Sequence, residues 1–406
     1  MRIVIYGLNY SPELTGVGKY TGEMSRWLSE HGHEVRVIAA LPYYPDWKVF
    51  SDYSSWRYYR DHNRNLDVYR CPLWVPRSPR LLKRVLHLVS FVITSLPVLL
   101  AQIIWRPKIV MVIAPTILCA PGALVVARIA RAASWLHIQD FELDIAKGLR
   151  MVQSHGMLGL AEKIESFLLS RFDRVSTISV SMAEKLGSKG VLPEKRVLFP
   201  NWVDTQSIRP LDGPSSLRIT FGIGQNVIVL QYAGNMGEKQ GLDVIISAAH
   251  RISDRKDILF VLAGDGMARQ RLEASTINRK NIMWLPLQPP EKLNDLLNLA
   301  DIHLLPQQAS AEGAVMPSKL TGMLASGRPI VAMASRGTPT ERAVEGRGLI
   351  AEPGDLDGFV EAITELASDK ERRNELGRRA REYAVESLGR DKIMEEFEVE
   401  LRALLS

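Results

Sequence analysis

The sequence predicts an α/β protein made of two halves, each with its own parallel sheet, and three observations support this. The chain has 406 residues, which is enough for two or three domains of ordinary size. Strand and helix patterns alternate along both halves, as they do in parallel βαβ units. Each half also opens with a strand, a glycine loop and a helix in the same order.

The elements of the first half follow from the period of their apolar residues. We predict strands at 2–6, 34–39, 109–114, 135–139 and 174–178, and helices at 20–30, 118–132, 157–171 and 180–188. Residues 42–80 are rich in Tyr, Trp, Pro and Arg, so we predict an irregular surface insertion or binding loop there. The apolar run at the N-terminus is too short for a signal peptide and is predicted to be a buried strand.

A stretch rich in Pro, Gly and Ser at 200–225 is the predicted hinge between the halves. The second half then repeats the pattern of strands and helices. We predict strands at 227–233, 259–263, 282–285, 302–305 and 330–333, and helices at 242–252, 291–299, 318–326 and 357–368. The last 30 residues are charged and amphipathic, and we predict one or two helices for them. We expect domains at 1–203 and 204–385, with 386–406 a helix that packs back on the first.

The first glycine loop contains Gly16 and Gly18 and lies just before a predicted helix. It matches neither the dinucleotide fingerprint, because the third glycine, Gly22, comes one position late, nor the phosphate-binding P-loop. Two interpretations stay open at this point. The loop is either an ordinary turn between strand and helix, or a place where backbone N–H groups and the helix N-terminus receive an anion.

Three loops of the second half point more clearly to a phosphate site. They are Gly234 to Gly241 with Lys239, then Gly264-Asp265-Gly266, and then Pro317-Ser318-Lys319. Ligands of open α/β sheets bind at the carboxyl ends of the strands, where such loops lie. We expect Ser318 to cap the helix that follows and the N–H groups of that helix to hold phosphate, and we expect Lys239 to neutralise a diphosphate.

Taken together, the motifs resemble those of the family 4 glycosyltransferases of the GT-B type. The resemblance extends over both halves and is carried by YSPELTGVGKYTGEM, HIQDFELD, FPNWVD, YAGNMGEKQGLD, LAGDG and VMPSKLTGMLASGRP. It is strongest to the bacterial transferases of colanic acid and related surface polysaccharides, including fucosyl and N-acetylfucosaminyl transferases. The resemblance implies two Rossmann-like domains facing across a cleft. It also implies a retaining, metal-independent hexose transfer, with a nucleotide sugar as donor substrate and no separate cofactor.

The resemblance also assigns site residues. The catalytic candidates are Asp140, His137, Lys239 and Glu312. The candidates for donor binding are Gly16, Gly18, Gly234, Asn235, Gly237, Gly264, Leu285, Pro286, Leu287, Pro317, Ser318, Lys319 and Leu320. Two departures stand out, because Asn235 replaces the usual arginine of the phosphate loop and Gly322 falls where the family has a second glutamate. These departures leave the usual ribose contact and the donor base, GDP or UDP, undecided.

Asp140 is the favoured base because it is the first carboxylate after the strand at 135–139. A general base has to lie within hydrogen-bond reach of the acceptor hydroxyl. His137 and Glu142 are further ionisable groups of the same segment. Two alternatives stay open: Asp140 caps a helix, or the leaving diphosphate takes the proton and no protein base is needed.

The basic residues are concentrated in one part of the chain. The formal charge is +6, yet no acidic residue occurs between Cys71 and Gln139, where the basic residues are Arg77, Arg80, Lys83, Arg84, Arg106, Lys108, Arg128 and Arg131. They flank residues 85–105, which carry no formal charge. We expect the segment 77–108 to contact an anionic membrane surface, where a lipid-linked saccharide acceptor would lie. A buried helix and a membrane span are the alternatives.

These features favour some classes of protein over others. A basic stretch interleaved with an aliphatic run argues against a nucleic-acid partner. Two isolated cysteines argue against a disulfide framework and a zinc site. We therefore expect a cytoplasmic enzyme, peripheral on the inner face of the cytoplasmic membrane. A nucleotide-sugar epimerase of the same fold and a non-catalytic membrane scaffold are the alternative functions.

Overall fold

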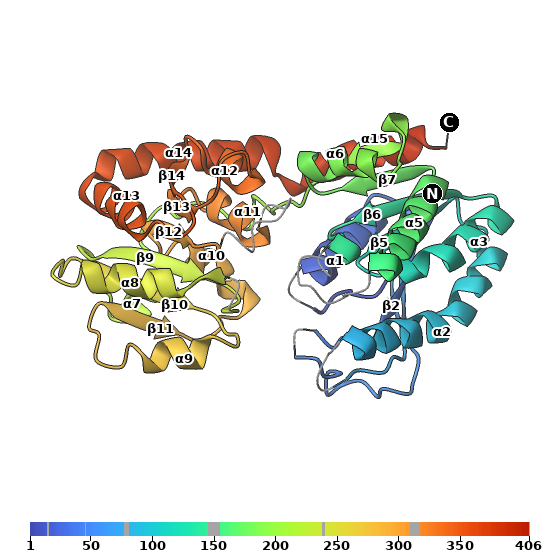
Figure 1. Cartoon of the computed structure of the whole chain (residues 1–406), viewed down its shortest axis with the longest axis horizontal. Helices are drawn as coiled ribbons and strands as arrows, with labels where there is room; N and C mark the ends of the chain where they lie inside the picture. The colour runs from blue at the N-terminus through green and yellow to red at the C-terminus, as the bar shows by residue number, and fades with distance from the viewer. Residues whose placement is uncertain are drawn as a thin grey trace. The chain divides into compact units, whose positions relative to one another are not determined.

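The computed structural model of the chain describes residues 1–13, 16–44, 46–76, 81–144, 155–237, 240–308 and 317–405. The chain forms two compact units, one made of Met1–Pro200 with Met394–Ser406 and the other of Asn201–Ile393 (Figure 1). Each unit contains one sheet and the helices that pack on it. The predicted fold class, α/β with two Rossmann-like domains, is confirmed.

The first unit has an eight-stranded sheet in the order β3-β4-β2-β1-β5-β6-β7-β8. The strands are β1 Arg2–Gly7, β2 Glu34–Ala40, β3 Tyr59–Asn63, β4 Leu66–Cys71, β5 Ile109–Ala114, β6 Ala133–Ile138, β7 Arg174–Thr177 and β8 Arg196–Leu198. All neighbours are parallel except β3 and β4. The apolar strands β1 and β5 are buried along nearly their whole length, as central strands of a covered sheet are. The strand order reverses between them.

The prediction of an irregular segment at 42–80 is wrong for the part that forms β3 and β4. These two strands make an antiparallel hairpin, and β4 extends the sheet beside β2. Ion pairs across the hairpin join Arg60 to Asp67 at 3.1 Å and Arg70 to Asp61 at 2.8 Å. The charges that look like a solvated loop in the sequence are therefore matched across the hairpin, which stabilises it.

Helices pack on this sheet, including its last strands β7 and β8. They are α1 Gly16–Glu30, α2 Leu81–Trp105, α3 Ala120–Ala130, α5 His155–Arg171 and α6 Val180–Ser188, with 3₁₀ turns at Ile117–Cys119 and Pro193–Lys195. The final helix, α15 Arg390–Ala403, brings the C-terminus onto this unit. There the ring of Phe397 stacks on Phe199 at 4.0 Å and meets Trp135 edge-on at 5.3 Å.

The second unit has a six-stranded sheet, parallel throughout, in the order β11-β10-β9-β12-β13-β14. Its strands are β9 Ile228–Ala233, β10 Ile258–Ala263, β11 Ile282–Leu285, β12 Ile302–Leu305, β13 Ile330–Met333 and β14 Gly348–Ala351. Numbered from β9, this is the 3-2-1-4-5-6 order of a doubly wound fold. The direction of winding changes between β9 and β12, so the ligand site of such a sheet is expected at their carboxyl ends.

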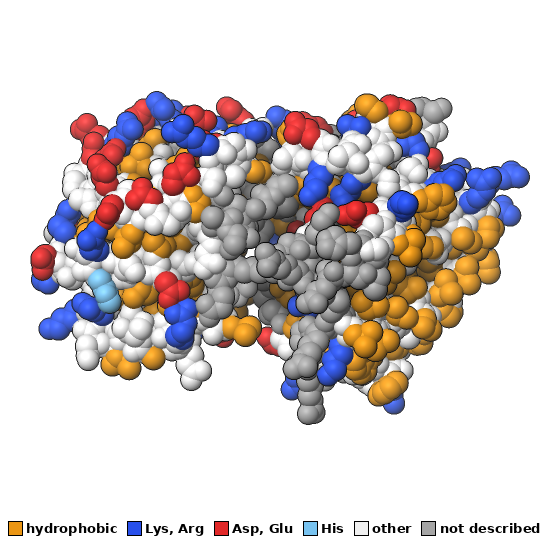
Figure 2. Space-filling view, viewed as in Figure 1, with side chains coloured by type: hydrophobic (Ala, Val, Ile, Leu, Met, Phe, Trp, Pro, Cys, Tyr) orange, Lys and Arg blue, Asp and Glu red, His pale blue; other side chains and the backbone are white. Residues whose placement is uncertain are grey.

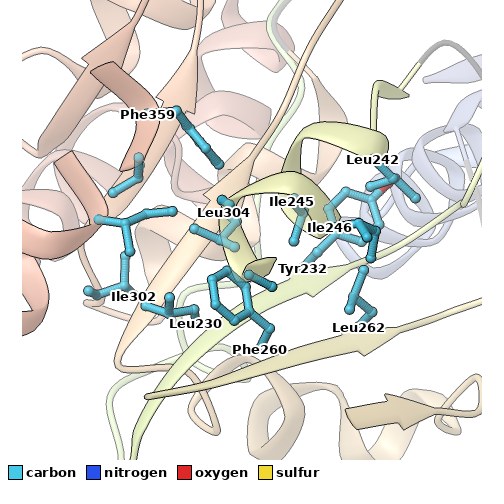
Figure 3. Packing of buried hydrophobic residues seen from close by; sticks show 14 of the residues in the cluster. Leu230, Tyr232, Leu242, Ile245, Ile246, Phe260, Leu262, Ile302, Leu304 and Phe359 are labelled. Atoms are coloured by element: carbon cyan, nitrogen blue, oxygen red, sulfur yellow. The ribbon is translucent and has the colours of Figure 1, made fainter. Parts of the chain in front are cut away.

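The helices of the second unit are α7 Ser216–Thr220, α8 Asp243–Arg251, α9 Arg269–Ala274, α10 Leu293–Leu297, α11 Ser318–Ala325, α12 Pro339–Val344, α13 Leu356–Ser368 and α14 Lys370–Ser387. One face of the sheet packs against α8 and α13, and Figure 3 shows this core from close by. Leu230 and Phe260 from the strands meet Ile245 of α8 and Phe359 of α13, all of them buried. This packing fixes the strand ends from which the phosphate-loop candidates emerge.

Candidate active site

The loops after β9 and β10 are joined through their backbones. The Gly234 N–H donates to the Ala263 carbonyl at 2.9 Å, and the Met236 N–H donates to the Asp265 carbonyl at 2.7 Å. A Cβ on Gly264 would lie 2.0 Å from the Gly234 oxygen, and the φ of Gly264 is 136°. Only glycine fits this position, because any side chain would force the two loops apart. Gly234 and Gly264 therefore build one rigid surface at the carboxyl edge of the sheet.

Asn235 and Gly237 continue this surface. The Asn235 carbonyl accepts a hydrogen bond from the Tyr232 hydroxyl at 2.5 Å, which fixes the loop to the strand before it. Gly237 lies beside the side chain of Gln240. The predicted phosphate contact Lys239 and the predicted sugar contact Glu312 lie outside the described residues.

Lys319 enters the same region from α11. Its ammonium lies 4.1 Å from the ring centroid of Tyr232, at the end of β9. Burial lowers the pKa of Lys319 to about 7, because water is largely excluded from the charged form. Within the described residues its charge meets an aromatic face and no carboxylate. A cation held in this way is poised to pair with an anion that the described residues do not supply.

The expectation that Ser318 caps α11 is wrong. Pro317 occupies the N-cap position, Ser318 is the first helical residue, and no side chain caps the helix. The Leu320 N–H donates to the Pro317 carbonyl at 2.9 Å, whereas no acceptor among the described residues caps the N–H groups of Ser318 and Lys319. Leu320 is fully buried in the unit's core, so its side chain anchors the helix and does not face a ligand.

The candidates for base contact at the end of β11 differ in exposure. Leu285 is buried in the core, whereas Pro286 and Leu287 are exposed. Arg269, which the sequence pattern did not single out, donates to the Leu285 carbonyl at 3.0 Å and also to the Gly264 carbonyl. Arg269 thereby holds the end of β11 against the glycine loop. Its signal in the sequence was weak, since it is one arginine among many.

In the first unit, α1 begins at Gly16, so Gly16 and Gly18 lie in its first turn and not, as predicted, in a loop before a helix that starts near residue 20. A Cβ on Gly18 would lie 2.9 Å from the Cβ of Glu13, so the first turn of α1 packs closely against Glu13. Glu13 is buried and accepts hydrogen bonds from Asn9 at 2.9 Å and from the N–H groups of Tyr43 and Tyr44 at 3.1 and 3.0 Å. Burial raises the pKa of this carboxyl. Glu13 is a positioning residue that the sequence reading missed, because its partners lie 30 residues further along the chain.

The segment after β6 places its ionisable groups in different surroundings. His137 is buried, with Nδ1 2.9 Å from the Ser176 hydroxyl and Nε2 3.2 Å from Gln139. Burial lowers its pKa to about 3, so this imidazole is neutral at physiological pH. Glu142 accepts from the Ile117 N–H at 2.9 Å and so links the ends of β5 and β6. Asp140 is half-buried just beyond the end of β6.

Comparison with known proteins decides what these loops belong to. Residues 217–383 match the family of glycosyl transferases group 1, and residues 15–202 match a glycosyl transferase 4-like domain. The chain is 41% identical to a protein of Escherichia coli K12 that is provisionally named as the colanic acid biosynthesis glycosyl transferase WcaI. The match covers 99% of this chain and 100% of the relative. This chain is a group 1 glycosyltransferase.

Solved structures agree on the fold of this glycosyltransferase. It is similar to sucrose-phosphate synthase from Thermosynechococcus elongatus, with a TM-score of 0.75 at 16% identity over 100% of this chain and 99% of that one. It is also similar to Anabaena HepE in complex with UDP-glucose, with a TM-score of 0.71 at 13% identity over 99% of this chain and 100% of that one. At these identities the likeness establishes the two-domain GT-B fold and leaves the substrates to other arguments.

Proposed function

We propose that this glycosyltransferase moves a hexose, with retention of configuration, from a nucleotide sugar to a saccharide acceptor. The acceptor is a lipid-linked or growing polysaccharide of the colanic acid type, and fucose or N-acetylfucosamine is the candidate sugar. The name of the Escherichia coli relative supports the polysaccharide. The UDP-glucose complex of HepE supports a nucleotide-sugar donor, with GDP as the alternative nucleotide.

The observation that carries the proposal is the pairing of Lys319 with the glycine loops at the point where the second sheet changes its winding. The diphosphate of a nucleotide sugar brings two negative charges to this edge, and a third develops on it as the bond to the sugar breaks. Lys319, the N–H groups of Ser318 and Lys319, which no described side chain caps, and the backbone of Gly234 supply positive charge and donors in a partly dehydrated setting. Such preorganised groups stabilise a leaving group without a metal ion. Lys239 and Glu312 remain proposed contacts of the diphosphate and the donor sugar.

In the proposed reaction the acceptor hydroxyl forms a bond to the anomeric carbon while the bond from that carbon to the diphosphate oxygen breaks. The hydroxyl proton passes to the leaving diphosphate or to Asp140, the half-buried carboxylate at the end of β6. His137 is neutral and hydrogen-bonded at both ring nitrogens, which suits a positioning role. Gly16 and Gly18 are proposed to face the diphosphate and the acceptor.

A donor screen tests the proposal. Thermal shift with GDP- and UDP-sugars identifies the donor, and calorimetric titration then measures its affinity. We expect Lys319→Met to weaken donor binding by roughly 10- to 100-fold, the range for loss of one charge-assisted contact. The matched control is Lys280→Met, an exposed lysine of the same unit. The proposal fails if no nucleotide sugar binds, or if both variants bind like the wild type.

We also propose that the first unit rests on an anionic membrane through α2. This helix is long and apolar enough to cross a membrane, yet one face packs in the domain through Phe91 and Leu99. The opposite face is exposed, with Leu82, Ile93 and Ile104 at 72%, 65% and 86% exposure. A helix with one face in a folded core suits contact with a membrane surface better than a span.

Exposed apolar residues of α3 enlarge this surface. They are Leu118, Val125 and Ile129, on the helix and turn that pack beside α2. Figure 2 shows the hydrophobic side chains gathered in a broad patch on this part of the molecule, with Lys and Arg at its border. Exposed Arg106 and Lys108 lie at one end of α2, and Arg131 follows α3. Cations beside an apolar face are the combination that anionic headgroups attract.

A further inference from the structure

The first unit holds a cavity that the transfer reaction described above does not use. Its volume is about 620 Å³, within the range of small-molecule sites. Three tryptophans line it, Trp47, Trp56 and Trp74, together with the charged side chains of Asp46 and Lys48. Ser90 and Thr94 of α2 form its floor. The cavity is therefore built between the segment before β3, the segment after β4 and α2.

The wall that carries Trp74 is fixed to α2 by hydrogen bonds. The Trp74 N–H donates to the Ser90 hydroxyl at 2.9 Å, and the Trp74 carbonyl accepts from Nδ1 of His87 at 2.6 Å. The Thr94 hydroxyl donates to the Pro72 carbonyl at 2.5 Å, and the Tyr58 hydroxyl donates to the Thr94 carbonyl at 2.9 Å. These contacts join three segments, so the cavity exists before any ligand enters.

Trp47 is held just as firmly on the opposite side. Its φ of 51° is a left-handed conformation that bulky residues rarely adopt. Ring contacts maintain it, at 5.6 Å to Tyr43 and 5.3 Å to His87, and the Arg84 guanidinium lies 5.6 Å from its ring. Backbone strain of this kind persists where the surroundings determine it, and it concentrates at binding sites.

We propose that this cavity binds pyranose rings of the acceptor saccharide. A pyranose presents a flat C–H face, which packs on an indole ring, and a rim of hydroxyls, which need hydrogen-bond partners. The indole rings of the three tryptophans supply flat surfaces for the C–H faces. Asp46 accepts from hydroxyls and Lys48 donates to them, and neither has an ion-pair partner within the described part of the chain. A hydrocarbon chain would instead make no use of the hydrogen-bonding capacity of these two exposed side chains.

The inference rests on the proposed transfer to a saccharide acceptor. It assigns recognition of that acceptor to this cavity. Ser90 and Thr94 lie on α2, the helix whose exposed face is proposed to meet the membrane. A saccharide linked to a membrane lipid would present its rings beside that face. The cavity would therefore bind rings of the acceptor and set acceptor specificity, apart from the donor loops of the second unit.

Saturation-transfer NMR with the full chain tests the inference, with lactose, cellobiose and 2′-fucosyllactose as probes. We expect saturation to reach the ring C–H protons of at least one sugar. Trp56→Ala and Trp74→Ala should each weaken its binding by roughly three- to tenfold, the worth of one aromatic contact. Both tryptophans are substantially exposed, at 88% and 45%, so neither change should unfold the domain. Trp105→Ala, at the end of α2 and outside the cavity lining, is the control.

The outcomes separate this inference from the proposed function. It is overturned if none of the three sugars receives saturation, or if the Trp56 and Trp74 variants bind them like the wild type. It is also overturned if the two variants lose binding of farnesol and keep the sugars, because the cavity then receives a lipid chain. The donor titration is carried out in parallel. If no nucleotide sugar binds to the wild type, the transferase proposal is refuted, whereas the result with the three sugars is unaffected.

Discussion

The two units share a strand order and differ in what their helices leave exposed. The parallel strands follow the order 3-2-1-4-5-6 in the second unit and the same order with a seventh strand added at the end in the first, and apolar central strands are buried in both. In the second unit, large exposed apolar side chains such as Ile219, Met267 and Ile277 lie on separate elements. In the first unit, α2 alone exposes Leu82, Val85, Leu86, Ile93, Leu96, Leu100 and Ile104.

The difference between scattered and contiguous exposed apolar side chains distinguishes what the fold requires from what binding a partner requires. Scattered exposed apolar residues are normal on any protein surface, whereas a contiguous patch indicates a partner. In the second unit the unusual features lie at the carboxyl ends of the strands. They are the glycine loops and the partly buried Lys319. The first unit places its unusual features on one helix and on the tryptophan cavity beside it. The same fold therefore carries the proposed nucleotide site, with its glycine loops and lysine, in one unit and an apolar surface in the other.

The largest expected effect concerns the glycine loops of the second unit. Gly264→Ala would push a Cβ against the Gly234 carbonyl, at a φ where only glycine is unstrained. We expect the free energy of unfolding to fall by at least about 3 kcal/mol, measured by urea denaturation. Gly213→Ala, at a glycine with nothing within 4 Å of the added atom, is the control and should be near neutral. Equal stability of the two variants would contradict the close packing of the loops.

A smaller effect concerns the charge on Lys319. Its pKa in the folded chain, about 7, lies below that of an unfolded lysine, near 10.4. The buried charge therefore opposes folding fully below pH 7, and this penalty is relieved as the pH rises from about 7 to 10. We expect Lys319→Met to be more stable than the wild type at pH 6, on the order of 1 kcal/mol, with the gain disappearing near pH 10.

The same titration predicts the pH dependence of donor binding. The diphosphate needs the protonated ammonium, so wild-type affinity should decline as the pH rises from 6 to 8. Calorimetry across this range, with Lys319→Met as a pH-independent reference, measures the decline. A flat profile in the wild type would show that Lys319 keeps its proton or does not meet the donor.

The smallest effect sharpens the contrast between the surfaces. Ile93→Gln and Ile104→Gln replace exposed apolar side chains of α2 and should leave stability within about 0.5 kcal/mol of the wild type. We expect each to weaken binding to phosphatidylglycerol vesicles by roughly fivefold, since part of one aliphatic side chain is lost from the membrane. Ile219→Gln, 89% exposed in the second unit, is the matched control and should not change vesicle binding. Equal binding by all three variants would remove the distinction between the two units.

Much of the fold could be predicted because its signals are local. Strands such as Ile109–Ala114 and Ile302–Leu305 are short apolar runs between turn residues, and they lie where the sequence placed them. The hairpin of β3 and β4 was not predicted, because its charged residues look like those of a solvated loop and pair only across the two strands. Short helices such as α9 and α12 were also not predicted, because six residues carry little periodicity. Of the site, the glycine loops were visible as motifs, and the partners Glu13 and Arg269 were not.

The sequence by itself determined that two parallel sheets form, where their glycine loops lie and which segment holds the surplus of basic residues. Apolar periodicity, glycine and charge act over a few residues, so they can be read in order along the chain. Only the tertiary structure decided which face of α2 stays exposed, that Lys319 lies over Tyr232 and that three tryptophans enclose one cavity. Each of these depends on packing between segments distant in sequence, where burial and neighbouring groups set the free energy.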